Sequence, residues 1–195
     1  MAHRTAPFLV AIALLGALGG CADPTAPLDV ATTVAEDRPF GQVANDAAIK
    51  LEFDRQLGTG STTSRLFFDV NCDVYEGRMM LTGSVKTQVD RERAVALARN
   101  VRGVKVVYDD VQVTDAGGFG SSAKDALIEA KIKARLIGAK GIKSINFRWQ
   151  SVNGTIYLIG RARTRNELDS VIAVIKDTED VKSVVSHAEV APDKA

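Results

Sequence analysis

Few residues of this chain could carry out catalysis. The sequence holds two histidines and two cysteines, and His3 lies in an N-terminal segment that we expect to be removed. A Ser-His-Asp or Cys-His arrangement would therefore have to use His187, and a zinc site built from histidine and cysteine would have only His187 and Cys72. No glycine-rich phosphate loop, GKS or GKT triplet, or HExxH motif occurs. We expect no enzyme activity, no metal and no cofactor, and we interpret Cys72 as a small buried side chain.

Cys21 is the residue whose setting points most clearly to chemistry. Arg4 provides a positive charge, and Pro7 to Gly20 carry no charged side chain. That run of about 14 residues is too short to cross a bilayer of about 30 Å as a helix, and its length is typical of a signal peptide. Leu18-Gly19-Gly20-Cys21 resembles the bacterial lipobox. The resemblance implies that residues 1–20 are cleaved off and that Cys21 is acylated, and Ala22 then favours the outer membrane.

Two alternatives to this interpretation stay open, a plain cleaved signal peptide and an uncleaved anchor. Residues 21–43 contain three prolines, several Thr and Ala, and few large apolar residues. Such a composition buries little surface, so we expect a disordered tether that faces the periplasm. Two acyl chains would make the anchoring stable.

A basic helix in the C-terminal half is the first candidate for a binding surface. Residues 44–113 carry ten Lys or Arg and ten Asp or Glu, whereas residues 122–191 carry twelve against eight, a net charge of +4. Anionic head groups attract such cations. Leu127 could dip between head groups while the neighbouring cations pair with phosphates. The predicted lipid-binding residues are Leu127, Lys124, Lys131, Lys133 and Arg135; the alternative is an ordinary solvated face.

Three alternating arginines form the second candidate. Arg161, Arg163 and Arg165 would lie on one side of an extended segment, which suits contacts to phosphate or carboxylate. Stacking aromatics do not accompany them, and an exported protein seldom meets nucleic acid, so we do not expect a nucleic-acid partner.

An internal repeat determines the elements that position these residues. A shift of 77 residues aligns Tyr75–Val113 on Val152–Val190 without a gap and with nine identities, among them Gly83 with Gly160. Upstream, Asp46 to Ile49 align on Asp125 to Ile128 after a two-residue adjustment. The simplest account is a duplicated unit of about 70 residues, close to the lower size at which a domain folds alone.

The residue pattern of each unit predicts secondary-structure elements in the order α-β-β-α-β. A stripe of apolar residues at i, i+4 and i+8 marks the first helix. Glu76-Gly77 and Asn153-Gly154 mark hairpin turns between strands starting near Leu66 and Ser144 and their returning partners. Thr87 and Thr164 are the expected N-caps of the second helix, with Gly103 and Asp180 after its end. A closing strand covers Val104–Val113 or Val181–Val190, so we predict an α+β fold in which two helices cover one face of a three-stranded sheet.

Each copy resembles a BON domain, a small module of bacterial envelope proteins. Met79-Met-Leu-Thr-Gly83 and Ile156-Tyr-Leu-Ile-Gly160, and the valine-rich closing strand, carry the resemblance. The expected domains are 44–113 and 122–191, with a glycine-rich linker at 114–121 and a tail at 192–195. We interpret Gly83 and Gly160 as structural glycines at a bend between strand and helix.

The resemblance implies a non-enzymatic envelope lipoprotein with two BON domains. Such proteins are associated with phospholipid binding and envelope integrity. The expected partner is an anionic phospholipid membrane, contacted by the second domain. The alternative is an adaptor that binds envelope proteins through its domains and touches lipid only through Cys21.

Overall fold

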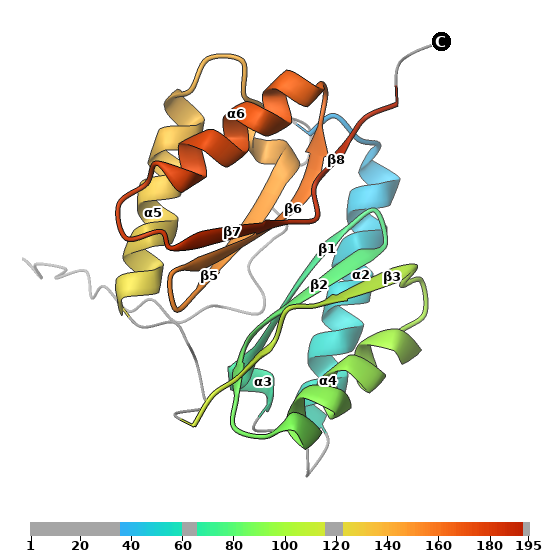
Figure 1. Ribbon diagram of the computed structural model, residues 1–195. Helices are drawn as coiled ribbons and strands as arrows, with labels where there is room; N and C mark the ends of the chain where they lie inside the picture. The colour runs from blue at the N-terminus through green and yellow to red at the C-terminus, as the bar shows by residue number, and fades with distance from the viewer. Residues whose placement is uncertain (1–35, 60–65, 116–122, 193–195) are drawn as a thin grey trace, which may run out of the picture.

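The computed structural model describes residues 36–59, 66–115 and 123–192, shown in Figure 1. The expected signal peptide, Cys21 and residues 116–121 of the predicted linker lie outside the described residues. The first repeat consists of α2 (Phe40–Thr59), α3 (Leu66–Asp69), β1 (Val70–Tyr75), β2 (Arg78–Val85), α4 (Gln88–Asn100), β3 (Val106–Asp109) and β4 (Gln112–Val113). The second consists of α5 (Ala123–Gly138), η1 (Ser144–Asn146), β5 (Phe147–Val152), β6 (Thr155–Ala162), α6 (Arg165–Lys176), β7 (Ser183–Ser186) and β8 (Glu189–Val190).

The first helix of each repeat forms because one apolar stripe can be buried. The apolar stripe predicted at i, i+4 and i+8 faces the core in both helices, as Ile49, Phe53 and Leu57 in α2 and as Ile128, Ile132 and Leu136 in α5. The second helices begin where the capping residues predict, since the Thr87 and Thr164 side chains accept hydrogen bonds from the backbone N–H of Asp90 and Glu167. Past the ends of these helices, Gly103 and Asp180 both adopt positive φ.

Each sheet has the same strand order. β2 pairs antiparallel with β1 and parallel with β3 and β4, and β6 pairs in the same way with β5, β7 and β8. The expected α+β fold with two repeated units is thus confirmed. The closing strand is interrupted in both copies, at 110–111 and 187–188, but the pairing register with the central strand continues across the break.

Two of the predicted boundaries differ from the structure. The first strand begins at Val70 and Phe147, because the four residues from Leu66 form the short helix α3 and the three from Ser144 form the 3-10 turn η1. Helix α2 begins at Phe40, inside the segment predicted as a tether. Backbone N–H groups of Gln42 and Val43 donate to the Pro39 carbonyl, so the first turn is already hydrogen-bonded there.

Gly83 and Gly160 lie inside the central strands rather than at a bend between strand and helix. A Cβ atom at Gly83 would lie 2.1 Å from the Asp69 carbonyl oxygen, and one at Gly160 would lie 2.3 Å from that of Asn146. The close approach of the backbone at Asp69 and at Asn146 therefore explains why both positions are glycine. Their structural role stands, but the reason differs from the predicted one.

The central strand of each sheet is buried on both faces. In β2, Met79 and Leu81 face the helices of their own domain while Met80 faces away, and in β6 Ile156 and Leu158 face the helices while Tyr157 and Ile159 face away. The side chains that face away form a third apolar cluster, which lies between the two sheets: Tyr75, Met80, Val152, Tyr157 and Ile159, with Tyr108 and Val185 at its margin.

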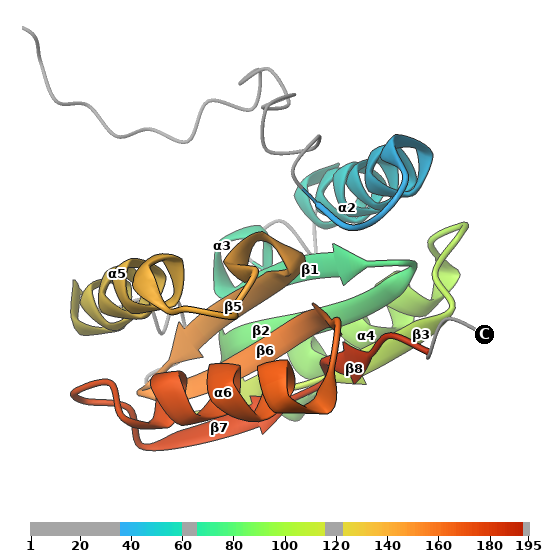
Figure 2. The ribbon, with the colours of Figure 1, turned by 90° about the horizontal axis from the view of Figure 1, so that it is seen from above.

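The protein is therefore a four-layer sandwich of helices, sheet, sheet and helices (Figures 1 and 2). The sequence left the relative orientation of the two domains open at the glycine-rich linker. Sheet-to-sheet packing supplies that orientation instead. Within the described residues, no helix combines the length and the apolar character needed to cross a membrane.

Candidate functional site

Helix α5 carries two apolar stripes. Ile128, Ile132 and Leu136 are buried in the core of the second domain. Successive helix residues are about 100° apart, so a second set of side chains lies on the opposite side. Leu127 and Ile137 on that side are 53% and 65% exposed. The exposed apolar residues of this outer stripe are Ala123, Ala126, Leu127, Ala130, Ala134 and Ile137.

The predicted cations lie on both sides of this outer stripe. Lys124 pairs with Asp180 at 3.0 Å, Lys131 with Glu179 at 2.6 Å, and Arg135 with Asp177 at 2.5 Å. All three acids come from the turn after α6. The structure thus brings the three cations together along one side of the helix, already paired with carboxylates, which the sequence did not indicate because the partners are more than 40 residues away.

Lys133 lies on the other side of the outer stripe. Within the described ranges it has no ion-pair partner, and it lines a groove of 680 Å³ between α5 and β5. Ile137, Ile145 and Trp149 give this groove apolar walls, and Arg148 adds a second cation. Ile137 was missed by the sequence interpretation, although a helical wheel extended by one turn would have placed it beside Leu127.

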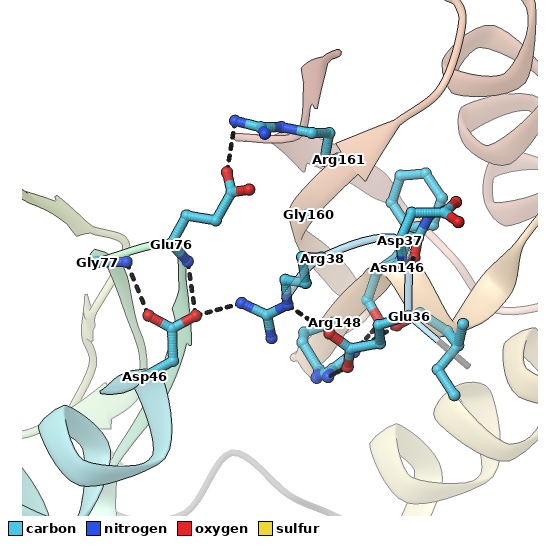
Figure 3. Close-up of polar contacts among 12 residues, drawn as sticks. Glu36, Asp37, Arg38, Asp46, Glu76, Gly77, Asn146, Arg148, Gly160 and Arg161 are labelled. Carbon is cyan, nitrogen blue, oxygen red and sulfur yellow. Dashed lines mark hydrogen bonds and ion pairs between the residues drawn. The ribbon is translucent and has the colours of Figure 1, made fainter. Parts of the chain in front are cut away.

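The three alternating arginines do not form one phosphate site. Arg161 crosses to the first domain and pairs with Glu76 at 2.5 Å (Figure 3). Arg163 donates to Glu167 at 2.9 Å and to the Gly141 carbonyl at 2.9 Å. Arg165 is exposed and is the first residue of α6, so the segment is not extended through it.

The carboxylate of Glu167 explains why Arg163 is not free. Burial raises the pKa of Glu167, but hydrogen bonds from the Arg163 side chain and from the backbone N–H groups of Lys143 and Arg163 outweigh that effect and leave the pKa lowered. Glu167 stays ionised and holds the guanidinium against the start of α6. An anionic ligand would have to displace this carboxylate.

Cys72 and His187 do not make a reactive pair. Cys72 packs in the core of the first domain, and burial raises the pKa of its thiol. His187 lies at the seam between the domains, where its ring stacks on Tyr108 with centroids 3.9 Å apart. Its Nε2 atom lies 2.7 Å from Asp110 Oδ2. No cluster of three metal-ligating side chains occurs in the described part of the chain.

Buried and partly buried polar contacts join the two domains along the seam. Arg78 of β2 donates to the carbonyl oxygens of His187 at 2.8 Å and Gly160 at 3.0 Å. Gln112 donates to the Tyr157 hydroxyl at 3.1 Å and to the Val152 carbonyl at 3.3 Å. These contacts orient the domains and leave α5 on the outside.

Residues 36–38 form a short strap from the start of α2 to the second domain (Figure 3). Glu36 pairs with both Arg38 and Arg148, and Arg38 in turn pairs with Asp46 and lies 4.0 Å over the Tyr75 ring. Asp37 accepts a hydrogen bond from the Asn146 side chain at 2.8 Å. The charge pattern alone gives no signal for this strap, because its partners in the second domain, Asn146 and Arg148, are more than 100 residues away.

Comparison with known proteins extends the resemblance seen in the sequence. The sequence model of a family described as BON domain matches residues 41–115 and 124–192. A protein encoded in the gshII 5' region of Anaplasma centrale is 35% identical over 144 residues, which cover 73% of this chain and 93% of that one.

Two further relatives have descriptive names. The outer membrane lipoprotein DolP of Haemophilus influenzae is 28% identical over 116 residues, covering 60% of each chain. The osmotically inducible protein Y of Escherichia coli is 29% identical over 118 residues, covering 60% of this chain and 59% of that one. The matched region thus spans about three fifths of each of these two proteins.

Proposed function

Because the chain belongs to the BON domain family and contains two copies of the domain, we propose that it is a non-enzymatic lipoprotein of the bacterial envelope. In this proposal an acylated Cys21 tethers the protein to the outer membrane on its periplasmic side, helix α5 binds anionic phospholipid, and the protein supports envelope integrity. The outer membrane lipoprotein DolP is a relative whose name fits this setting.

The observation that carries the proposal is the outer stripe of α5. A helix that buries one apolar stripe in its own domain and exposes a second one, flanked by cations, has the amphipathic form of an interfacial membrane helix. Leu127 and Ile137 are its two large exposed side chains. Alanines between them let the helix axis approach the head groups closely.

The ion pairs of Lys124, Lys131 and Arg135 are compatible with this role. Their acidic partners at 177 and 179 have side chains 81% and 78% exposed, and exposed pairs of this kind contribute only about 0–1 kcal/mol. Exchange of a carboxylate for a lipid phosphate therefore costs little. Lys133 needs no such exchange and is the first cation that we expect to contact a head group.

Vesicle flotation tests the lipid-binding step. The whole mature chain with Cys21→Ser is the right material, because an isolated second domain would expose the apolar cluster between the sheets. We expect flotation with vesicles that contain phosphatidylglycerol and much less with phosphatidylcholine alone. Leu127→Glu and Ile137→Glu should each abolish it, whereas Val89→Glu, on the exposed side of α4, should not.

Equal recovery on both kinds of vesicle, or equal binding by the Leu127→Glu and Val89→Glu variants, would contradict the proposal. The anchoring step has its own test, which is fractionation of cells that express the intact protein or its Cys21→Ser variant. We expect the intact protein to stay in the membrane fraction and a large share of the variant to leave it, because lipid binding by α5 alone is weaker than an acyl anchor.

A further inference from the structure

The first helices of both domains and helix α3 share one side of the molecule. In Figure 2, α2, α3 and α5 lie along the upper side, whereas α6 and β7 lie along the lower side. Nine large hydrophobic side chains are exposed in the described part of the chain, and six of them belong to these three helices. Those six are Phe40, Leu51, Phe67, Phe68, Leu127 and Ile137.

Phe67 and Phe68 are the most unusual members of this set. Leu66 is buried in the core and fixes the single turn of α3, so the two residues that follow point outward. Their rings meet edge to face with centroids 5.3 Å apart, and Phe68 is 64% exposed. Two adjacent exposed aromatic rings are a large apolar feature for a protein surface and mark a contact site.

The position of Glu36 indicates what covers the side of the molecule that carries α2, α3 and α5. Glu36 is paired with Arg148, which lines the groove beside α5. Fourteen residues separate Glu36 from Cys21. Such a segment spans at most about 50 Å when fully extended. A lipid on Cys21 would therefore hold the bilayer within reach of α2, α3 and α5.

We infer that Phe67 and Phe68 form a second membrane contact, supplied by the first domain, and that their occupant is the lipid bilayer. This inference rests on the proposed function for the anchor at Cys21. Because the two sheets pack on each other, α3 and α5 are presented to one bilayer together. Aromatic rings favour the interfacial region of a bilayer, and α5 itself has none.

Spin labels on the whole mature chain with Cys21→Ser, bound to vesicles containing phosphatidylglycerol, test the inference, because a free thiol at Cys21 would also react with the label. Nitroxides are attached at Phe68→Cys, at Ile137→Cys and, as a matched control on the other side, at Val89→Cys, which replaces a valine that is 53% exposed. Cys72 is buried and should not react with the label. Access of each label to a lipid-soluble and a water-soluble relaxing agent is then measured.

We expect the label at 68 to be reached by the lipid-soluble agent and shielded from the water-soluble one, with the reverse at 89. A label at 68 that is as accessible to water as the one at 89 would overturn the inference, and so would one shielded from both agents, which would indicate a protein contact. The label at 137 reports separately on α5, so the experiment can show that one of the two helices, α3 or α5, contacts the bilayer and the other does not. In flotation, Phe67→Ser with Phe68→Ser should weaken binding about tenfold, and Val89→Ser should not.

Discussion

Asp110 and His187 occupy equivalent positions in the two repeats, and their side chains contact each other, with Oδ2 and Nε2 2.7 Å apart. The same holds for Asp73 and Gln150, which are also 77 positions apart and are hydrogen-bonded. A residue that contacts its own equivalent lies on a two-fold axis. The duplicated domains therefore face each other about an approximate two-fold axis, and the repeat encodes its own interface.

The Asp110–His187 pair should stabilise this interface. Loss of the hydrogen bond and of the ring stacked on Tyr108 in His187→Ala should lower the free energy of unfolding by about 1–2 kcal/mol. Urea denaturation of both single variants and of the double variant with Asp110→Ala measures the coupling. Strictly additive losses would show that the two side chains do not act on each other.

Asp73 should be a destabilising residue at neutral pH. Burial raises the pKa of its carboxyl group, against the lowering effects of Lys50 and Arg148, and its Oδ2 atom has no hydrogen-bond partner among the described residues. A raised folded-state pKa means that the unfolded chain gives up the proton first as the pH rises, so the folded state loses stability above about pH 4.

We therefore expect Asp73→Asn to unfold at higher urea concentration than the wild type at pH 7, by about 1 kcal/mol or more. The difference should shrink as the pH falls toward 4, where the wild-type carboxyl group becomes protonated. A variant that is less stable at pH 7, or a difference that does not change with pH, would count against this explanation.

Asp46 of α2 and its equivalent in α5, Asp125, should be important for folding. Asp46 accepts hydrogen bonds from the backbone N–H groups of Glu76 at 2.7 Å and Gly77 at 2.8 Å, and Asp125 does the same for Asn153 and Gly154. Asp46→Ala should cost about 2–3 kcal/mol, because two backbone donors, one buried and one partly buried, lose a charged acceptor. Thermal unfolding measures this, with Asp54→Ala on the same helix as the control that should cost little.

Gly83 and Gly160 should tolerate no side chain. An alanine Cβ would collide with the carbonyl oxygen of an adjacent backbone segment. A backbone carbonyl cannot rotate away as a side chain can. We expect Gly83→Ala and Gly160→Ala each to cost more than about 2 kcal/mol. Gly138→Ala, where no atom lies within 4 Å of the added carbon, should leave stability nearly unchanged. A Gly83→Ala protein as stable as Gly138→Ala would contradict the role assigned to close approach.

Local sequence patterns predicted the helices and strands well, but they did not predict the contacts between these elements. The stripe of Ile128, Ile132 and Leu136 and the cap at Thr164 are encoded within a few residues, and the structure has both where the sequence placed them. The sequence shows the apolar run from Ile156 to Ile159, but it does not identify the surface that buries Tyr157, which is the other sheet.

The ion-pair partners of the basic residues could not be predicted from the sequence either. Lys131 looked free in the sequence, because Glu179 is brought to it only by the packing of α6 beside α5. Arg161 looked like part of a phosphate site, because its partner Glu76 belongs to the other repeat. Charge counts predicted the basic helix, and tertiary structure decided which of its cations have partners.

The most direct test of the membrane role of α5 is to map its contact with lipid residue by residue. Backbone amide resonances of the isotope-labelled mature chain are followed by NMR while short-chain phosphatidylglycerol is added. We predict that the largest changes fall on the outer stripe of α5, at residues 126–137, and that helix α4 is unaffected. Changes centred on α4 or on the seam around His187, or equal changes with phosphatidylcholine, would contradict the proposed function.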